Sequence, residues 1–182
     1  MKLREIRKMN FINDGSRSLF ESIAIPEVEY SLKNWKKNNI NDLGILIGGC
    51  AVSYYTRPRG TTDADILYLT VDDIPTSVDG FKRNRPGAFE NKVTGVEIEV
   101  LTPTSIGLSP ALAEKVFDTK QTIDGTFVAS PSALVALKLQ RMKRYDEGDI
   151  ASLIETGLVD LTDWPISADQ LKMYNDILEK NK

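Results

Sequence analysis

Two aspartates one residue apart carry the most specific chemistry in this sequence. They lie in GGCAVSYYTRPRGTTDADILYL, residues 48–69, which also holds two adjacent glycines and two arginines. Alternate residues of a strand share one face, so Asp63 and Asp65 should point the same way, about 6.5–7 Å apart. Like charges on one face repel, whereas a divalent cation favours this arrangement because Mg²⁺ prefers carboxylate oxygens. The spacing predicts a Mg²⁺ or Mn²⁺ site; the alternative is a solvated acidic start to a strand.

A third carboxylate is available in VEIEV, residues 96–100. Glu97 and Glu99 should share one face of this strand, with three apolar residues on the other. Two metal ions about 4 Å apart, held by such acids, can clamp the attacking and leaving oxygens of a displacement at phosphorus. From the residues alone either glutamate could complete the set, and a half-exposed strand with a solvated face would show the same alternation.

The glycines and arginines fit a phosphate ligand. Between a strand and a helix, Gly48 and Gly49 would let backbone amides approach a phosphate, although a tight turn also explains them. Arg57 and Arg59 flank a proline in the loop before the aspartates. Either their guanidinium groups bind phosphates of the substrate, or they are ordinary surface arginines. The sequence contains no GxxxxGK[ST], which excludes a P-loop.

The composition excludes several other chemistries. The 182 residues carry a net charge of −3, with 41% hydrophobic and 27% charged residues, which is typical of one soluble domain and not of a basic nucleic-acid platform. The absence of histidine excludes histidine-based zinc sites and nucleophiles activated by histidine. The single Cys50 cannot form an internal disulfide, and no secretory signal or membrane-spanning run is visible. We therefore expect a cytoplasmic protein with no membrane partner.

These residues need a sheet and helices to position them. A short apolar run that leads into a glycine turn predicts a buried strand at 43–49, and hydrophobic alternation predicts strands at 63–71 and 95–103. Serine caps, prolines and helical periodicity predict helices at 16–25, from Pro26 to about 39, and at 50–56, 109–118, 130–144, 146–157 and 167–180. The segment 72–90 is expected to be mostly loop. The order of elements predicts an α+β fold with helices packed on a mixed β-sheet.

The motifs together resemble the nucleotidyltransferase superfamily typified by DNA polymerase beta, and within it the small bacterial abortive-infection type-II toxin-like proteins. In that pattern a Gly-Gly-x-Ala turn opens a helix, and Arg-x-Thr-x-Asp-x-Asp follows at the next strand. The matching residues are Gly48, Gly49, Ala51, Arg59, Thr61, Asp63 and Asp65. Cys50 stands where many members have serine.

Later segments continue the resemblance, which covers roughly residues 43–155. The family's third acid precedes two apolar residues, which places it at Glu99, a glutamate where aspartate is more usual. The segment LVALKLQRMKRYDEGDI is similar to the family's Leu-x-Ala-Leu-Lys-Leu helix and the Asp-x-x-Asp-Ile run that follows it. The matching residues there are Lys138, Arg144, Asp146 and Asp149.

The resemblance implies a function and assigns roles. It implies Mg²⁺- or Mn²⁺-dependent transfer of a nucleoside monophosphate from an NTP, such as ATP, to a hydroxyl of RNA (tRNA included), of a protein or of a small molecule. The implied catalytic and metal-binding residues are Asp63, Asp65 and Glu99. The implied nucleotide-binding residues are Gly48, Gly49, Arg59, Thr61 and Lys138, with Lys138 neutralising phosphates. Residues 1–130 would form the catalytic core with N-terminal helices, and residues 131–182 a C-terminal helical segment packed on it.

The same resemblance suggests a toxin of a toxin-antitoxin or phage-defence system, with an antitoxin protein as partner. Two other functions fit the residues. One is a non-catalytic module of the same fold that binds a nucleotide or a partner. The other is a metal-dependent phosphoesterase, in which the acids would activate water. Release of pyrophosphate is expected only for the transferase.

Overall fold

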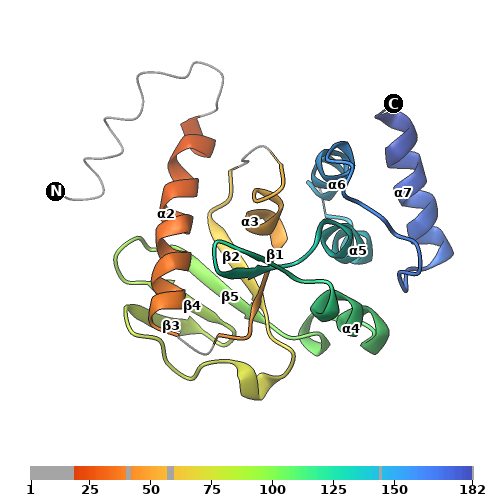
Figure 1. Ribbon diagram of the computed structural model, residues 1–182. Coiled ribbons are helices and arrows are strands. Elements are labelled where there is room, and N and C mark those ends of the chain that lie inside the picture. The colour runs from red at the N-terminus through yellow and green to blue at the C-terminus, as the bar shows by residue number, and fades with distance from the viewer. Residues whose placement is uncertain (1–18, 40–41, 57–59, 144, 182) are drawn as a thin grey trace.

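The computed structural model describes residues 19–39, 42–56, 60–143 and 145–181. The described residues form an α+β protein with one mixed sheet and helices packed against it (Figure 1). The predicted α+β class is therefore confirmed. The predictions that concern Arg57, Arg59 and Arg144, and the expected start of a helix at residue 16, lie outside the described residues.

Among the described residues seven strands make the sheet, in the spatial order β3-β4-β5-β2-β1-β7-β6. Their bounds are β1 Ile45–Ile47, β2 Asp63–Leu67, β3 Phe81–Arg85, β4 Ala88–Asn91, β5 Glu97–Leu101, β6 Gln121–Ile123 and β7 Thr126–Val128. The central strand β2 runs antiparallel to β1 and parallel to β5. Its apolar residues Ala64 and Ile66 are buried and alternate with its aspartates, as the sequence pattern predicted.

One long helix covers one face of the sheet. This helix, α2, spans Leu19–Lys37 and lies across the sheet in Figure 1. Its Trp35 is fully buried and meets the rings of Phe81 and Phe89 edge-on, with both centroids at 5.1 Å. The prediction that a helix begins at Pro26 is wrong, because Pro26 lies inside α2. In a sequence, proline is typical of the first turn of a helix, but it is also tolerated within a helix at the cost of one backbone hydrogen bond.

The other helices gather on the opposite side of β1 and β2 (Figure 1). Their bounds are α3 Gly48–Val52, α4 Pro110–Asp118, α5 Pro131–Arg141, α6 Asp146–Glu155 and α7 Ala168–Lys180, and two 3-10 turns lie at Val71–Asp73 and Thr104–Ile106. Ser109, Ser130 and Ser167 cap α4, α5 and α7 by accepting a backbone N–H, and the Ser-Pro sequences predicted this for α4 and α5. Helix α5 is buried along most of its length and belongs to the same apolar core as the central strands.

Two hairpins were missed by the sequence patterns. The segment expected to be loop contains β3 and β4, and β6 and β7 follow α4. Of the five residues of β3, FKRNR, only Phe81 is buried. A strand at the edge of a sheet is held by backbone pairing on one side, so it needs no apolar alternation and gives no such signal in the sequence.

Candidate active site

A glycine turn brings the end of β1 against the acid on β2. Ile47 pairs with Asp65 across the two antiparallel strands, and the chain turns into α3 at Gly48, whose φ is +70°. A β-carbon on residue 48 would overlap the carboxylate of Asp65. Only glycine fits both the left-handed backbone and this contact, so the turn can pack directly against the Asp65 carboxylate.

The acids predicted for catalysis lie on adjacent parallel strands. Asp63 pairs with Glu97 and Asp65 with Glu99 in the β2–β5 register. Burial, and then the neighbouring charges of Asp63 and Glu99, raise the pKa of Asp65 to about 6. Glu99 is the direct cross-strand neighbour of Asp65. The alternation in the sequence therefore predicted correctly that these carboxylates share one face of the sheet.

The two glutamates have different surroundings. Glu97 accepts hydrogen bonds from Asn84 Nδ2 at 2.8 Å and from Arg85 Nη2 at 2.5 Å. The hydrogen bond from Asn84, opposed by partial burial and helped by Arg85, lowers the pKa of Glu97. Glu99 accepts a longer bond from Arg85 at 3.3 Å and contacts Asp65. The structure thus places Glu99, and not Glu97, beside the central aspartate.

Asp63 is exposed, and its carboxylate is turned toward a threonine. The buried Thr61 hydroxyl lies 3.1 Å from Asp63 Oδ1 and 3.1 Å from the Asp63 carbonyl oxygen. Thr61, which the resemblance assigned to nucleotide binding, therefore orients the first aspartate in this structure. Its role at a nucleotide stays a prediction.

A small pocket opens beside Asp65. It has a volume of about 150 Å³ and lies between the glycine turn, the end of β5 and α5. The lining includes Gly48, Asp65, Lys138 and Arg141, and apolar residues such as Leu134 form most of the remaining wall. The pocket thus brings together Gly48, Asp65 and Lys138, which come from three separate segments and were predicted from the sequence to share one site.

Lys138 lines this pocket, but its ammonium group is held by carboxylates. Its side chain is 3% exposed and donates to Asp146 Oδ1 at 2.9 Å and to Asp149 Oδ2 at 2.6 Å. Burial works against the charged form of Asp146, yet bonds from Lys138 and from the Lys143 amide leave its pKa lowered. The three residues join α5 to α6. A direct contact of Lys138 with nucleotide phosphates stays a prediction.

Arg141 is a pocket residue that the motifs did not single out. It lies one helical turn after Lys138 on α5, so both reach the same side. Its Nε contacts Asp146 Oδ2 at 3.4 Å, and its side chain is 45% exposed. Its charge also opposes the rise in the pKa of Asp65. The i, i+3 spacing from Lys138 was the signal in the sequence that could have identified it.

The donor set is chemically suited to a hard divalent cation. Carboxylate oxygens are what Mg²⁺ and Mn²⁺ prefer, and here a half-buried carboxylate has two acidic neighbours whose negative charges help to raise its pKa. Within the described ranges no three His, Cys, Asp or Glu side chains already converge as a metal-binding group. The side chains of Asp63 and Glu99 have partners of their own, Thr61 and Arg85.

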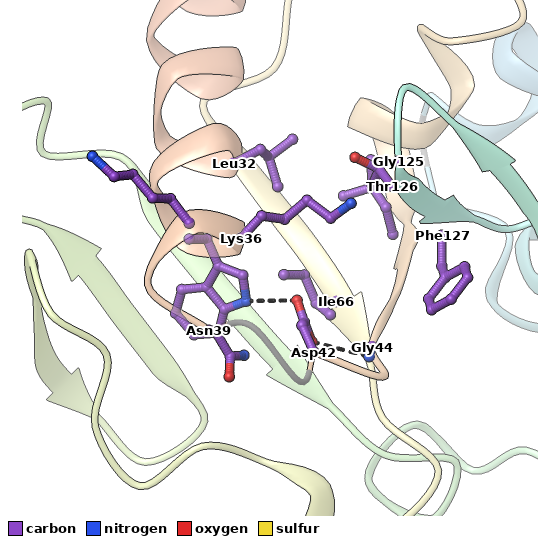
Figure 2. A pocket seen from close by; sticks show the side chains of 12 residues that line it. Leu32, Lys36, Asn39, Asp42, Gly44, Ile66, Gly125, Thr126 and Phe127 are labelled. Atoms are coloured by element: carbon purple, nitrogen blue, oxygen red, sulfur yellow. Dashed lines mark hydrogen bonds between the residues drawn. The ribbon is translucent and has the colours of Figure 1, made fainter.

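A larger cavity lies away from these acids. It has a volume of about 490 Å³ and is shown in Figure 2, between the end of α2, the start of β1 and the turn before β7. Ile66 is part of its lining, and successive strand residues face opposite sides, so it lies across the sheet from Asp65. At its edge Asp42 accepts from Trp35 Nε1 at 3.1 Å, Tyr68 Oη at 2.7 Å and the Gly44 amide at 3.0 Å. These bonds connect Asp42, just before β1, to Trp35 of α2 and to Tyr68.

No protein-family model matches the chain, and no curated protein sequence matches it. Among the helices of the described residues, none is both long enough and apolar enough to cross a membrane.

Proposed function

We propose that this protein is a divalent-metal-dependent nucleotidyltransferase, which moves a nucleoside monophosphate from an NTP to a hydroxyl group. The observation that carries the proposal is the contact between three segments. Asp65 on β2 lies against the Gly48 turn on one side and against Glu99 on the other. This is the arrangement that the motif resemblance implied, with a glycine turn, an Asp-x-Asp strand and a later acid.

The pocket beside Asp65 supports binding of a phosphate chain. Its 150 Å³ is small for a whole nucleotide, since ligand pockets typically enclose about 300–1,000 Å³. We propose that the phosphates enter it and that the nucleoside lies over its mouth. The half-exposed Arg141 supplies a planar guanidinium suited to phosphate oxygens. Asp146, which also binds the buried Lys138, contacts Nε of this arginine.

Each acid has a proposed task. Asp63, Asp65 and Glu99 would hold the divalent cation, which would neutralise phosphate charge and polarise the reacting oxygens. Glu99 accepts the proton of the acceptor hydroxyl. The acceptor oxygen then forms a bond to the α-phosphorus while the bond from that phosphorus to the bridging oxygen breaks. The products are the nucleotidylated acceptor and pyrophosphate, and positioning supplies much of the rate.

The proposal is tested by transfer of label from the NTP. The protein is incubated with each α-labelled NTP, Mg²⁺ and total RNA or total protein, and incorporated label and pyrophosphate are measured. Both are expected for one NTP and one acceptor class, and both should be lost in Asp63→Asn/Asp65→Asn. Release of inorganic phosphate without label transfer would instead assign a phosphoesterase. Nucleotide binding without turnover would assign a non-catalytic module.

The proposal of a toxin rests on the resemblance alone. Growth arrest on expression of the wild type, absent for Asp63→Asn/Asp65→Asn, would support it. A partner protein that relieves this arrest would then be the antitoxin.

A further inference from the structure

A charged row crosses four strands and ends at the acids of the proposed site. In the β3–β4 and β4–β5 registers, Arg85 pairs with Ala88 and Ala88 pairs with Glu99. Glu99 in turn pairs with Asp65 on β2. Positions opposite one another across strands share a face, so one arginine and two acids lie in line on the same side of the sheet.

The backbone of β3 is shaped so that Arg85 faces this row. The register slips between Arg83 and Arg85, which marks a β-bulge. As a result Asn84 and Arg85 both reach Glu97, although neighbouring residues of a regular strand would point to opposite faces. Arg83 points the other way and places its guanidinium 5.3 Å from the centre of the Phe89 ring.

The residue between Arg85 and Glu99 leaves room for the contact. Ala88 is fully buried and has only a methyl side chain. Arg85 Nη2 donates to Glu99 Oε1 at 3.3 Å and also to Glu97 Oε1 at 2.5 Å. The bond to Glu97 is the shorter one, so Glu97 is the anchor of Arg85 and Glu99 is its second, looser partner.

We propose that Arg85 is a built-in counter-cation that competes with the divalent cation for Glu99. With no ion bound, Arg85 balances the charge of Glu99 beside Asp65. When the ion binds, Glu99 exchanges Arg85 for the metal, and Glu97 keeps the guanidinium at the edge of the site. This gives the second glutamate of VEIEV a role distinct from metal binding. The inference rests on the proposed function, because it takes Asp65 and Glu99 as ligands of the metal.

Direct titration with Mn²⁺ tests the competition. Free Mn²⁺ is followed by its electron paramagnetic resonance signal in the presence of wild type, Arg85→Gln and Arg83→Gln. The two variants lose the same charge from the same strand, but only Arg85 contacts Glu99. We expect Arg85→Gln to bind Mn²⁺ about three- to tenfold more tightly than wild type, since a competing cation has been removed. Arg83→Gln should stay within about twofold, as expected for a more distant, screened charge.

The controls separate this inference from the proposed function. Asp65→Asn should lose Mn²⁺ binding, and thermal melting should show that each variant is folded. Mn²⁺ binding that depends on Asp65 but is equal in wild type and Arg85→Gln would overturn the role of Arg85 alone. An equal gain in Arg85→Gln and Arg83→Gln would also overturn it, because it would reflect net charge only. Failure of every variant to bind Mn²⁺ would overturn the metal site and the inference with it.

Discussion

Gly48 and Asp65 are in such close contact that residue 48 has no room for a side chain. A β-carbon there would overlap the Asp65 carboxylate, and the φ of +70° lies where side chains are strained. This contact fixes the distance between the glycine turn and the acid, and hence one wall of the pocket. The geometry of the proposed site therefore depends on a residue with no functional group.

We expect Gly48→Ala to damage both the fold and the site. The left-handed backbone should cost about 1–2 kcal/mol of the free energy of unfolding, and the displaced Asp65 carboxylate should lower nucleotide transfer strongly. Gly148 is the matched control, because it is helical and has nothing within 4 Å of its added β-carbon. Gly148→Ala should be neutral or stabilising by up to about 1 kcal/mol. Urea unfolding and transfer assays measure both effects, and equal behaviour of the two variants would contradict the contact.

Substitution of Glu99 should lower turnover more than substitution of Glu97. Glu99→Gln should lower turnover by about 10²–10⁴-fold, which is typical for loss of a general base. Glu97→Gln should have a mild effect, because Glu97 is bonded to Asn84 and Arg85 and lies farther from Asp65 in the register. Steady-state turnover of both variants checks this. The reverse order would move the proposed base to Glu97.

The raised pKa of Asp65 predicts a pH dependence of stability. Its pKa is about 6 in the folded protein against an ordinary value of 3.8, so folding takes up a proton between these pH values. Ionised Asp65 therefore destabilises the fold above pH 6, by up to about 3 kcal/mol at 1.4 kcal/mol per pKa unit. This loss should disappear as the pH falls from 7 toward 4.

Urea unfolding at several pH values measures the contribution of Asp65 to the free energy of unfolding. Asp65→Asn should remove the dependence between pH 4 and 6, while Asp63→Asn should only reduce it, since Asp63 is one of several causes. Added Mg²⁺ should lower the pKa of the Asp65 carboxyl, which NMR titration can follow. A pKa of Asp65 near 3.8 without metal would show that burial and the neighbouring charges do not act as described.

Lys138 should contribute mainly to stability through its buried ion pairs. Lys138→Met removes the buried ammonium group that bonds to both Asp146 and Asp149, and breaking such buried ion pairs should cost about 3–5 kcal/mol. Lys180→Met is the matched control, because Lys180 makes a bond of the same 2.9 Å to Glu147 but both side chains are exposed. No measurable loss is expected there, since exposed pairs contribute little. Similar melting temperatures for the two variants would refute the buried role.

Arg141 should act on the nucleotide more than on the fold. Arg141→Gln removes only a half-exposed contact with Asp146, so stability should change by less than about 1 kcal/mol. If Arg141 binds phosphates, the apparent KM for NTP should rise and should depend less steeply on salt, because one screened attraction is gone. Kinetics at two salt concentrations check this. A KM and salt dependence equal to those of wild type would remove Arg141 from the proposed site.

Features that depend on local spacing could be predicted from the sequence. Alternation placed Asp63 and Asp65 on one face of a strand, and Glu97 and Glu99 on one face of another, because the side-chain period of a strand is two wherever it pairs. Serine before proline marked the starts of α4 and α5, since a helix cap is decided by a few adjacent residues.

The tertiary structure alone decided which residues meet. Which glutamate adjoins Asp65 follows from the β2–β5 register. The contact of Arg85 with Glu99 needs the β3–β4 hairpin and its bulge, which no apolar alternation in the sequence predicts. The burial of Lys138 depends on α6 folding back so that Asp146 and Asp149 reach it. These contacts join residues that lie apart in the chain, and pairing, register and burial are set by the packing of whole elements, which no local pattern encodes.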